Sequence, residues 1–517
     1  MVALTLRQLK LISVITDINL LDSIANCKRL SREMLPRMPF LQVSKARLSF
    51  APLTNDNPQR MDDLMTRPTP DRQSLREALA DGARHGRYVL RNLRLCSALT
   101  TTGSTAADAE FMLTDVTIEN GEIAATNPTG IFAADAGTLS IDAGGRVALP
   151  AFVDCHTHLD KGHILPRTPE ADGSFAGAMT ATISDRTQNW SHEDVARRMD
   201  FALRCAYHYG TIAIRTHLDS KPPQDAISWP VFQELRDQWR GRIELQAACL
   251  FGIDLARDQV ALEDIARRVA AAGGMLGAVA FPTPDLDMLL DRMFATATRF
   301  GMDLDFHADE TADPSADALR RIAEAALRSR FSGKVLVGHC CSLARQDHAA
   351  VDETLDKVAL AGVAVVSLPM CNLYLQDRRN DGTTPRWRGV TLLHEMKQRG
   401  IAVALASDNT RDPFYAYGDL DMMETYRMGT RILHLDHQVG DWPRAVSATP
   451  AAIMRLDGKG VIAEGQPGDF TLFEGRTWSE LLSRPESNRI VVRHGAPIDA
   501  PLPSYAELDD LSGLALQ

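Results

Sequence analysis

The feature that most constrains this chain is an alternation of short apolar runs with amphipathic stretches between Val147 and Leu456. The apolar runs are Val147–Cys155, Thr211–His217, Ile243–Phe251, Met275–Phe281, Leu304–His307, Val335–His339, Val363–Leu368 and Ile401–Ala406. Helical spacing occurs between them, as at Glu193–Tyr209, Leu262–Ala272 and Ser315–Ser329. Continuous apolar strands that alternate with helices indicate a parallel sheet buried on both faces. Eight such repeats predict an α/β fold, a (β/α)8 TIM-type barrel over residues 150–456.

The segments on either side of this region predict a second, smaller domain. The segments typical of strands are Tyr88–Leu95, Asp115–Ala125, Thr138–Val147, Gly465–Phe473 and Arg489–His494. Turns are expected at Asn120-Gly121, within the second segment, and at Gly144-Gly145, within the third. We expect residues 88–149 and 457–505 to combine into one small β-sandwich once the barrel has been inserted between them.

Residues 1–87 fit neither domain. They contain helix-like stretches, prolines near position 70 and several methionines, among them Met34, Met61 and Met65. We interpret them as an N-terminal extension that is loosely attached or lies upstream of the true start, because termini without a docked element are usually poorly ordered. A short lead-in helix is expected over Ser74–His85, and a chain that begins at Met65 is expected to fold and to be active.

Charge and cysteine content limit the classes of partner. The formal net charge of -11 argues against nucleic-acid binding, which requires a basic surface. The eight cysteines form no CxxC pair, and a chain of this length does not need disulfide bonds, so a reducing compartment is expected. No apolar run is long enough to cross a membrane, and Leu11–Ile15 is too short for a secretory signal. We therefore expect a cytoplasmic protein without nucleic-acid or membrane partners.

The strongest chemical signal is a pair of histidines, His156 and His158, at the end of the first apolar run. Residues two apart in a strand share a face, so both imidazoles are expected to point into the barrel, while Cys155 and Thr157 point out. Two imidazoles at the carboxyl-terminal mouth of a barrel suit a divalent metal ion. The alternative is that both histidines only pack against other side chains, and the nearby Asp160 argues against this alternative.

Three more apolar runs end in polar clusters. The fifth is followed by His307-Ala308-Asp309-Glu310, the sixth ends in His339-Cys340-Cys341, and the eighth is followed by Ser407-Asp408-Asn409. The carboxyl ends of barrel strands form the active-site face in this architecture. One such cluster could be a core histidine with a satisfied partner, but four clusters at four strand ends predict an active site.

These motifs resemble the cytosine deaminase branch of the amidohydrolase superfamily, which includes the isopropylammelide amidohydrolases of triazine breakdown. The resemblance runs from about Tyr88 to the last strands. Its supports are the segments FVDCHTHLDK, IRTHLDS, HADE, GHCCSL, CNLYLQDR and ASDNTRDPFYAYGDLDMM.

The resemblance implies one divalent metal ion, zinc or iron, held by His156, His158, His307 and Asp408. It implies that Glu310 carries protons, that His339 contacts the attacking water, and that Asp408 or His339 takes the proton of that water. A divalent ion lowers the pKa of a bound water from about 15.7 toward 7. Binuclear relatives carry a carboxylated lysine on the fourth strand, and Leu276–Phe281 contains none.

The resemblance also places five residues in the substrate pocket: His217, Gly252, Asn409, Phe414 and Lys161. A core histidine is the alternative for His217, and a solvated lysine is the alternative for Lys161. Cytosine deaminases carry a glutamine at the position of Gly252 and an aspartate at that of Asn409. We therefore expect weak activity on cytosine and better activity on a larger or more oxygenated ring, because Gly252 leaves room where the relatives place an amide.

The expected function is that of a deaminase, a hydrolase that acts on carbon–nitrogen bonds other than peptide bonds. Water is expected to attack a cyclic amidine carbon of a small nitrogen heterocycle, with release of ammonia or an amine. One alternative is ring-opening hydrolysis of a cyclic amide, and another is an inactive scaffold that has kept the barrel. We also expect a homo-oligomer.

Overall fold

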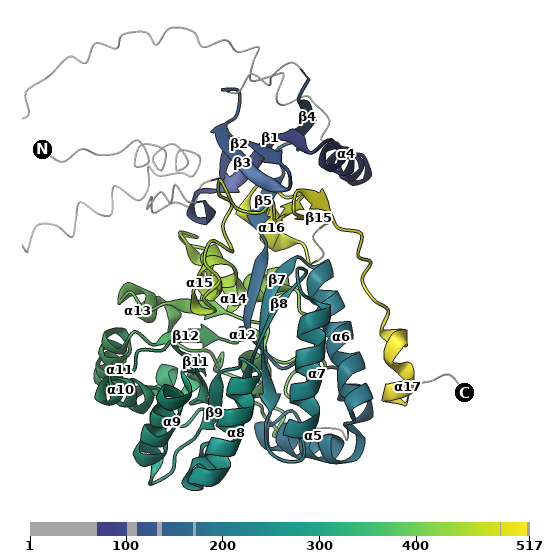
Figure 1. Ribbon diagram of the computed structural model, residues 1–517. Helices are drawn as coiled ribbons and strands as arrows, with labels where there is room; N and C mark the ends of the chain where they lie inside the picture. The colour runs from purple at the N-terminus through teal and green to yellow at the C-terminus, as the bar shows by residue number, and fades with distance from the viewer. Residues whose placement is uncertain (1–69, 101–110, 132–136, 169–171, 486–487, 514–517) are drawn as a thin grey trace, which may run out of the picture. The chain divides into compact units, whose positions relative to one another are not determined.

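The flanks of the chain meet in one mainly antiparallel sheet. The computed structural model describes residues 70–100, 111–131, 137–168, 172–485 and 488–513 (Figure 1). The eight strands of this sheet are β1 (Arg87–Cys96), β2 (Phe111–Glu119), β3 (Glu122–Pro128), β4 (Leu139–Asp142), β5 (Val147–Pro150), β14 (Phe470–Phe473), β15 (Arg489–Arg493) and β16 (Ala496–Pro497). Their order is β16-β15-β14-β5-β1-β2-β3, with β4 paired to β1. The pairing of β14 with β5 joins the two flanks, as the sequence predicts.

The two halves of strand β1 pair with different strands. Tyr88–Arg91 pair with β4, whereas Arg94 and Leu95 pair with β5. Between these halves the pairing of β1 with β2 shifts register, and Asn92 has a φ of 58°. This irregularity lets one strand serve two neighbours in succession. The two flanks therefore share a single sheet, and a two-layer sandwich stays a prediction.

Helix α4 (Arg72–His85) includes the predicted lead-in helix. Its Leu75 and Leu79 are buried in one cluster with the apolar residues of the flanking sheet. Asp71 caps the helix by accepting hydrogen bonds from two backbone N–H groups, and Gly86 ends it in the left-handed region. Residues 1–69, most of the predicted extension, lie outside the described residues.

The central region consists of parallel strands, which confirms the predicted α/β class. One sheet contains β6 (Phe152–Thr157), β7 (Thr211–Asp219) and β8 (Glu244–Leu250). The other contains β9 (Leu276–Ala280), β10 (Leu304–Ala308), β11 (Val335–His339), β12 (Ala364–Ser367) and β13 (Val403–Leu405). The predicted single run Val147–Cys155 was wrong, because it divides into β5 and β6 at Pro150 and Ala151. Proline has no N–H for a ladder, which suits a strand end.

Single parallel bridges connect the two sheets. Ala248 pairs with Met275 and Gly252 pairs with Val279, which joins the end of β8 to β9. On the other side Thr157 pairs with Asp408, which joins the end of β6 to the segment after β13. The carboxyl ends of β6 and β13, where predicted site residues lie, are therefore neighbours.

Helices cover the parallel strands (Figure 1). They are α5 (Phe175–Asn189), α6 (His192–His208), α7 (Asp225–Gln238), α8 (Gln259–Ala271), α9 (Leu286–Phe300), α10 (Ala318–Ser329), α11 (His348–Ala361), α12 (Pro369–Leu375), α13 (Leu393–Gln398), α14 (Met422–Leu433) and α15 (Ala448–Ile453). Helix α10 begins at Ala318 and not at Ser315, because the carboxylate of Asp309 accepts hydrogen bonds from the backbone of Ala318 and Leu319. Two short helices, α16 (Trp478–Ser483) and α17 (Asp509–Ser512), follow in the C-terminal flank.

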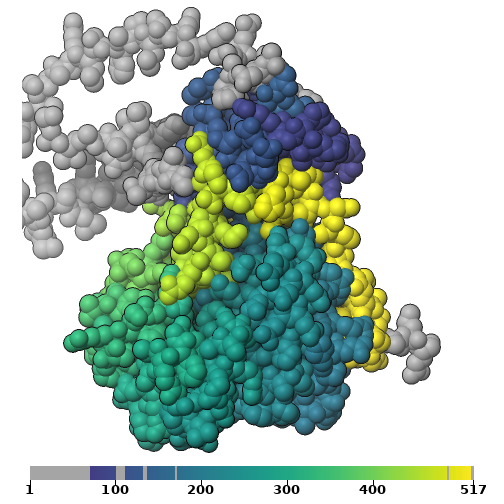
Figure 2. All heavy atoms as spheres, viewed as in Figure 1, coloured from purple at the N-terminus to yellow at the C-terminus, as the bar shows by residue number. Residues whose placement is uncertain are grey.

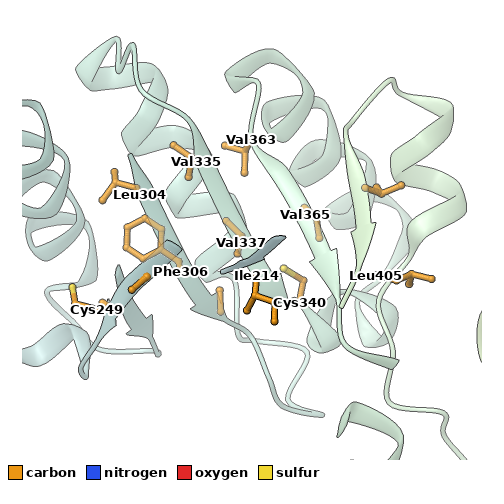
Figure 3. Packing of buried hydrophobic residues seen from close by; sticks show 14 of the residues in the cluster. Ile214, Cys249, Leu304, Phe306, Val335, Val337, Cys340, Val363, Val365 and Leu405 are labelled. Atoms are coloured by element: carbon orange, nitrogen blue, oxygen red, sulfur yellow. The ribbon is translucent and has the colours of Figure 1, made fainter. Parts of the chain in front are cut away.

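Alternate residues of the strands face these helices. Leu304, Phe306, Val335, Val337, Val363, Val365 and Leu405 belong to one buried cluster (Figure 3). The Phe306 ring stacks on Phe294 of α9 with 6.1 Å between centroids. Because side chains alternate along a strand, Asp305 and His307 point to the opposite face.

The C-terminal segment runs along α6 (Figure 2). Arg197 of α6 forms an ion pair with Asp510 of α17 at 2.7 Å, and Arg204 pairs with Glu507 at 2.7 Å. Among the helices of the described ranges, none is both long and apolar enough to cross a membrane.

Candidate metal and catalytic site

The predicted ligands converge at the carboxyl ends of the parallel strands. Oδ1 of Asp408 lies 3.6 Å from Nε2 of His156 and 3.3 Å from Nε2 of His158. The Nε2 atoms of His158 and His307 are 3.2 Å apart. Side chains from β6, β10 and the segment after β13 thus present their donor atoms to a common point.

The donor set fits a divalent metal ion. The side chains of all four residues are nearly or fully buried, and neither carboxylate oxygen of Asp408 accepts a hydrogen bond from an N–H or hydroxyl group of a described residue. Both ring nitrogens of His156 likewise have no hydrogen-bond partner within the described ranges. Buried polar atoms without partners are costly, and a cation bound between them removes that cost. Separations of 3.2–3.6 Å between donors are those expected of ligands that each lie about 2.0–2.2 Å from one ion.

The protonation states favour ligation as well. Burial lowers the pKa of His156, His158 and His307 well below the usual value, so their imidazoles are neutral and keep a lone pair. Burial raises the pKa of Asp408 to about 7 where no cation is present. A positive ion beside this carboxyl group would return it to the charged form.

His217 lies with these histidines and not on the wall of the substrate cavity, which corrects its predicted place. Its ring centroid is 4.1 Å from that of His156, and its Nε2 lies 3.1 Å from Oδ1 of the buried Asp305. Arg215 donates to the other oxygen of Asp305 at 3.1 Å. A nitrogen of His217 lies within 4.8 Å of nitrogens of His156, His158 and His307, so it is a further candidate ligand on geometry.

Glu310 and His339 form a second group beside the ligands. Oε1 of Glu310 lies 3.3 Å from Nδ1 of His339. The amide nitrogen of Asn372, in α12, lies 3.3 Å from the same oxygen and 2.9 Å from the same ring nitrogen. Burial and the nearby Asp408 raise the pKa of Glu310 well above its usual value. A carboxyl group with a raised pKa can both accept and release a proton near neutral pH.

Asn372 defines the tautomer of His339. Its NH2 group has two hydrogens, which match the two acceptors Oε1 of Glu310 and Nδ1 of His339. Because Nδ1 accepts, the single proton of the neutral imidazole lies on Nε2, which has no partner among the described residues. Burial lowers the pKa of His339 to about 3, so the ring stays neutral. His339 therefore presents an N–H donor to the site.

A cavity of about 760 Å³ opens beside this group, and His158, His307, Glu310, His339 and Asp408 line it. Helix α5 contributes Phe175, Met179 and Ile183, which are spaced four residues apart and therefore share one face of the helix. The buried hydroxyl of Thr182, from the same helix, also lines the cavity and has no partner among the described residues.

Two predicted pocket residues lie together in the cavity wall. Nζ of Lys161 is 5.2 Å from the ring centroid of Phe414 and 3.9 Å from Oδ1 of Asp219. Lys161 is buried, which excludes the alternative of a solvated lysine. Arg186 of α5 pairs with the other oxygen of Asp219 at 2.5 Å, so one carboxylate is shared by two cationic side chains.

The other two predicted pocket residues, Asn409 and Gly252, also line the cavity, but their neighbours differ from those that the sequence predicts. The amide of Asn409 donates to Asp412 at 2.7 Å, and its oxygen lies 3.6 Å from the thiol of Cys371, so this side chain is engaged within the protein. The expected free space at Gly252 was wrong. A Cβ added there would lie 2.5 Å from Oδ1 of Asp254 and 3.3 Å from Cε1 of Phe281, and both of these residues line the cavity.

Sequence reasoning missed Asn372, Asp254 and Thr182. Asn372 lies within CNLYLQDR, a segment that supported the resemblance, so its motif carried a signal. Asp254 follows Gly252 by two residues in a short 3-10 helix, Ile253–Arg257, and no pattern distinguishes it from a surface aspartate. Thr182 lies in a helix whose role in the cavity is visible only in the folded chain.

Residues 214–499 match the model of an amidohydrolase family. The chain is 50% identical over 428 residues to a pterin deaminase from Rhizobium rhizogenes, an alignment that covers 83% of this chain and 97% of the relative. The chain therefore belongs to the amidohydrolase family, which confirms the predicted relationship.

Solved structures have the same fold. A 5-methylcytosine deaminase from Klebsiella pneumoniae gives a TM-score of 0.69 with 24% identity, over 81% of this chain and 98% of that chain. An N-isopropylammelide isopropylaminohydrolase from Burkholderia multivorans gives 0.64 with 24% identity, over 80% and 98%. At this level of identity the two structures support the architecture alone.

Proposed function

We propose that this protein is a metal-dependent deaminase of a bicyclic aminated heterocycle of the pterin class. The observation that carries this proposal is that three of the four proposed ligands, His158, His307 and Asp408, share the wall of one cavity of about 760 Å³ with Glu310. A cavity of this size is within the range of about 300–1,000 Å³ that is typical of sites for drug-sized ligands. The pterin deaminase that is 50% identical over nearly its full length supports this substrate class.

We infer that His156, His158, His307 and Asp408 hold one zinc or iron ion. When bound, the ion supplies a water molecule of lowered pKa, near 7 instead of about 15.7. Imidazole and carboxylate ligands suit both metals, so the donor set does not choose between them. Strand β9 contains no lysine that could bridge a second ion, which supports a single one.

The chain's own groups then divide the proton transfers. Asp408 accepts the proton of the attacking water, because the Nε2 of His339 already carries a hydrogen. The Nε2–H group of His339 donates a hydrogen bond to the water oxygen and so orients the water. Glu310 protonates the ring nitrogen beside the carbon under attack, takes the remaining proton from the new hydroxyl group and passes it to the departing amine. The proton held by Asp408 then returns to Glu310, which restores the starting state. The sum is the exchange of a C–NH2 group for C=O, with water consumed and ammonia released.

We propose that the wall residues orient the ring. Lys161 lies against Phe414 and is suited to donate to a ring oxygen or nitrogen. The apolar face of α5 and the Phe281 ring supply flat surfaces that exclude water from the bound heterocycle. Asn409 holds the loop between Asp408 and Phe414 through its bond to Asp412.

We further propose that the two parallel sheets form one closed (β/α)8 barrel. The bridges Gly252–Val279 and Thr157–Asp408 support closure on both sides. The flanking sheet, which bends at Asn92, is the counterpart of the predicted sandwich. A homo-oligomeric assembly and a cytoplasmic location remain predictions.

The test is a panel of aminated heterocycles, including pterin, cytosine and an aminotriazine, assayed for ammonia release with metal-loaded protein. We expect turnover of pterin and a kcat/KM for cytosine well below about 10⁴ M⁻¹s⁻¹, the lower range of dedicated enzymes. Mass spectrometry of the product separates deamination from ring opening, since only deamination exchanges nitrogen for oxygen. A protein that binds metal and turns over no member of the panel would contradict the proposal.

A further inference from the structure

We propose that Asp254 selects the substrate by accepting a hydrogen bond from an N–H group on the edge of the heterocycle, while Phe281 packs against the ring. This inference rests on the proposed deaminase function. It assigns a specificity-determining role to a residue at the end of β8, where the cytosine deaminases that the sequence resembles carry a neutral amide.

The geometry around Gly252 brings the two groups together. A methyl group added to Gly252 would meet Oδ1 of Asp254 at 2.5 Å and Cε1 of Phe281 at 3.3 Å. The carboxylate and the ring therefore lie against the same point of the backbone. Both side chains line the cavity that holds Glu310, and Phe281 is 38% exposed although it is a large apolar side chain. A glycine at position 252 is what permits this arrangement.

The Asp254 carboxylate is available to a ligand. Within the described ranges, no hydrogen bond or ion pair is formed by its oxygens. Arg257, which is close in sequence, pairs instead with Asp285 at 2.8 Å. By contrast, Asp219 in the cavity wall forms an ion pair with Arg186. Asp254 thus differs from Asp219, whose carboxylate is already paired, and from Asp408, which is assigned to the metal.

The chemistry of a carboxylate determines what it selects. An ionised carboxylate accepts hydrogen bonds and cannot donate them, whereas an amide does both. A ring that presents an N–H to Asp254 gains a charge-assisted hydrogen bond. A ring that presents a carbonyl oxygen there places the negative end of a dipole beside the carboxylate, and it loses the bond that an amide would donate. Asp254 therefore favours amino- and imino-bearing edges and disfavours the oxo-bearing edge of cytosine.

The experiment compares Asp254→Asn with Asp264→Asn, a matched control on the exposed face of α8 that makes the same change of charge. We expect Asp254→Asn to raise KM for pterin about 10- to 100-fold and to lower the ratio of kcat/KM for pterin over cytosine by at least about tenfold. Gly252→Ala, which displaces the carboxylate, is expected to act in the same direction. The control is expected to leave KM and the ratio unchanged.

Equilibrium binding of the dioxopteridine product, which keeps ring N–H groups beside its carbonyl groups, reads the N–H contact with Asp254 without turnover. We expect Asp254→Asn to weaken this binding about tenfold or more relative to the control. Wild-type protein that deaminates none of the heterocycles contradicts the proposed function, and the binding titration still decides the role of Asp254. Equal binding and an equal substrate ratio in Asp254→Asn and Asp264→Asn would overturn the inference.

Discussion

The hydroxyl of Ser407 donates a hydrogen bond to Oδ2 of Asp154 at 2.5 Å. Asp154 lies in β6 and Ser407 directly precedes the predicted ligand Asp408, so the bond links segments from opposite ends of the parallel region. The backbone N–H of Asp408 donates to the carbonyl of His156 at 2.9 Å, and the Thr157 hydroxyl donates to the carbonyl of Asp408 at 2.7 Å. Two ligands that are distant in sequence are thereby fixed relative to each other.

Removal of the Ser407 hydroxyl is expected to weaken this link. Ser407→Ala leaves a buried carboxylate oxygen without its donor, which costs about 1–3 kcal/mol in the free energy of unfolding. Chemical denaturation measures the loss, and elemental analysis after dialysis measures metal retention, which we expect to fall. The exposed Ser483→Ala is the control. Unchanged stability and metal content in Ser407→Ala would contradict a role for this bond.

Loss of one imidazole is expected to abolish metal binding. His307→Ala removes a donor from the cluster, and we expect both metal content and activity to disappear, because three remaining ligands hold the ion too weakly through dialysis. Elemental analysis of wild-type protein is expected to give one equivalent per chain. The exposed His348→Ala serves as the control. Two equivalents in the wild type, or full activity without metal, would refute the single-ion site.

A variant of Glu310 is expected to lose catalytic activity while it still binds the metal. Glu310→Gln keeps the size of the side chain and removes its acid–base function, so kcat should fall about 10²–10⁴-fold while the metal is retained. Steady-state kinetics and elemental analysis on the same sample test both halves. Glu353→Gln, on the surface of α11, is the matched control. Near-normal turnover in Glu310→Gln would show that another group moves the protons.

We expect Asn372 to affect catalysis by positioning Glu310 and His339 and not by contacting the substrate. It does not line the cavity, and its NH2 group positions Glu310 and His339. Asn372→Ala leaves two buried acceptors without a donor, a change of about 1–3 kcal/mol that corresponds to roughly 5- to 150-fold in kcat. KM should change little. A rise in KM with constant kcat would instead indicate a direct contact with substrate.

His163 is expected to make stability depend on pH. Burial, assisted by the positive charges of Arg411 and Arg198, lowers its pKa to about 3, whereas an unfolded histidine titrates near 6.5. As the pH falls from about 6.5 toward 3, the unfolded state binds a proton that the folded state does not, so stability is lost. We expect His163→Asn to show a shallower loss in denaturation at pH 4 to 7.

Asparagine suits this test because His163 has a φ of 62°, a conformation that asparagine tolerates. The control is His494→Asn, which replaces an exposed histidine with a φ of 47°. The same slope of stability against pH in wild type and His163→Asn would show that His163 does not contribute.

The sequence by itself determined the parallel α/β region and most of the candidate site. Period-two placement put His156 and His158 on one face, and His307, His339 and Asp408 were placed at strand ends along one edge; the roles of these residues stay predictions. These inferences succeed because side-chain direction along a strand and the side of a parallel sheet on which its strands end follow from local backbone geometry.

Only the tertiary structure decided which groups meet across the site. The contacts of Asn372 with Glu310, of Phe281 with the backbone at Gly252, and of His217 with Asp305 all join residues from different elements or loops. No short-range pattern encodes them, because such contacts depend on how helices pack on strands and on where each loop returns. The free space expected at Gly252 was wrong for this reason: a missing Cβ can be filled by any side chain that the fold brings near.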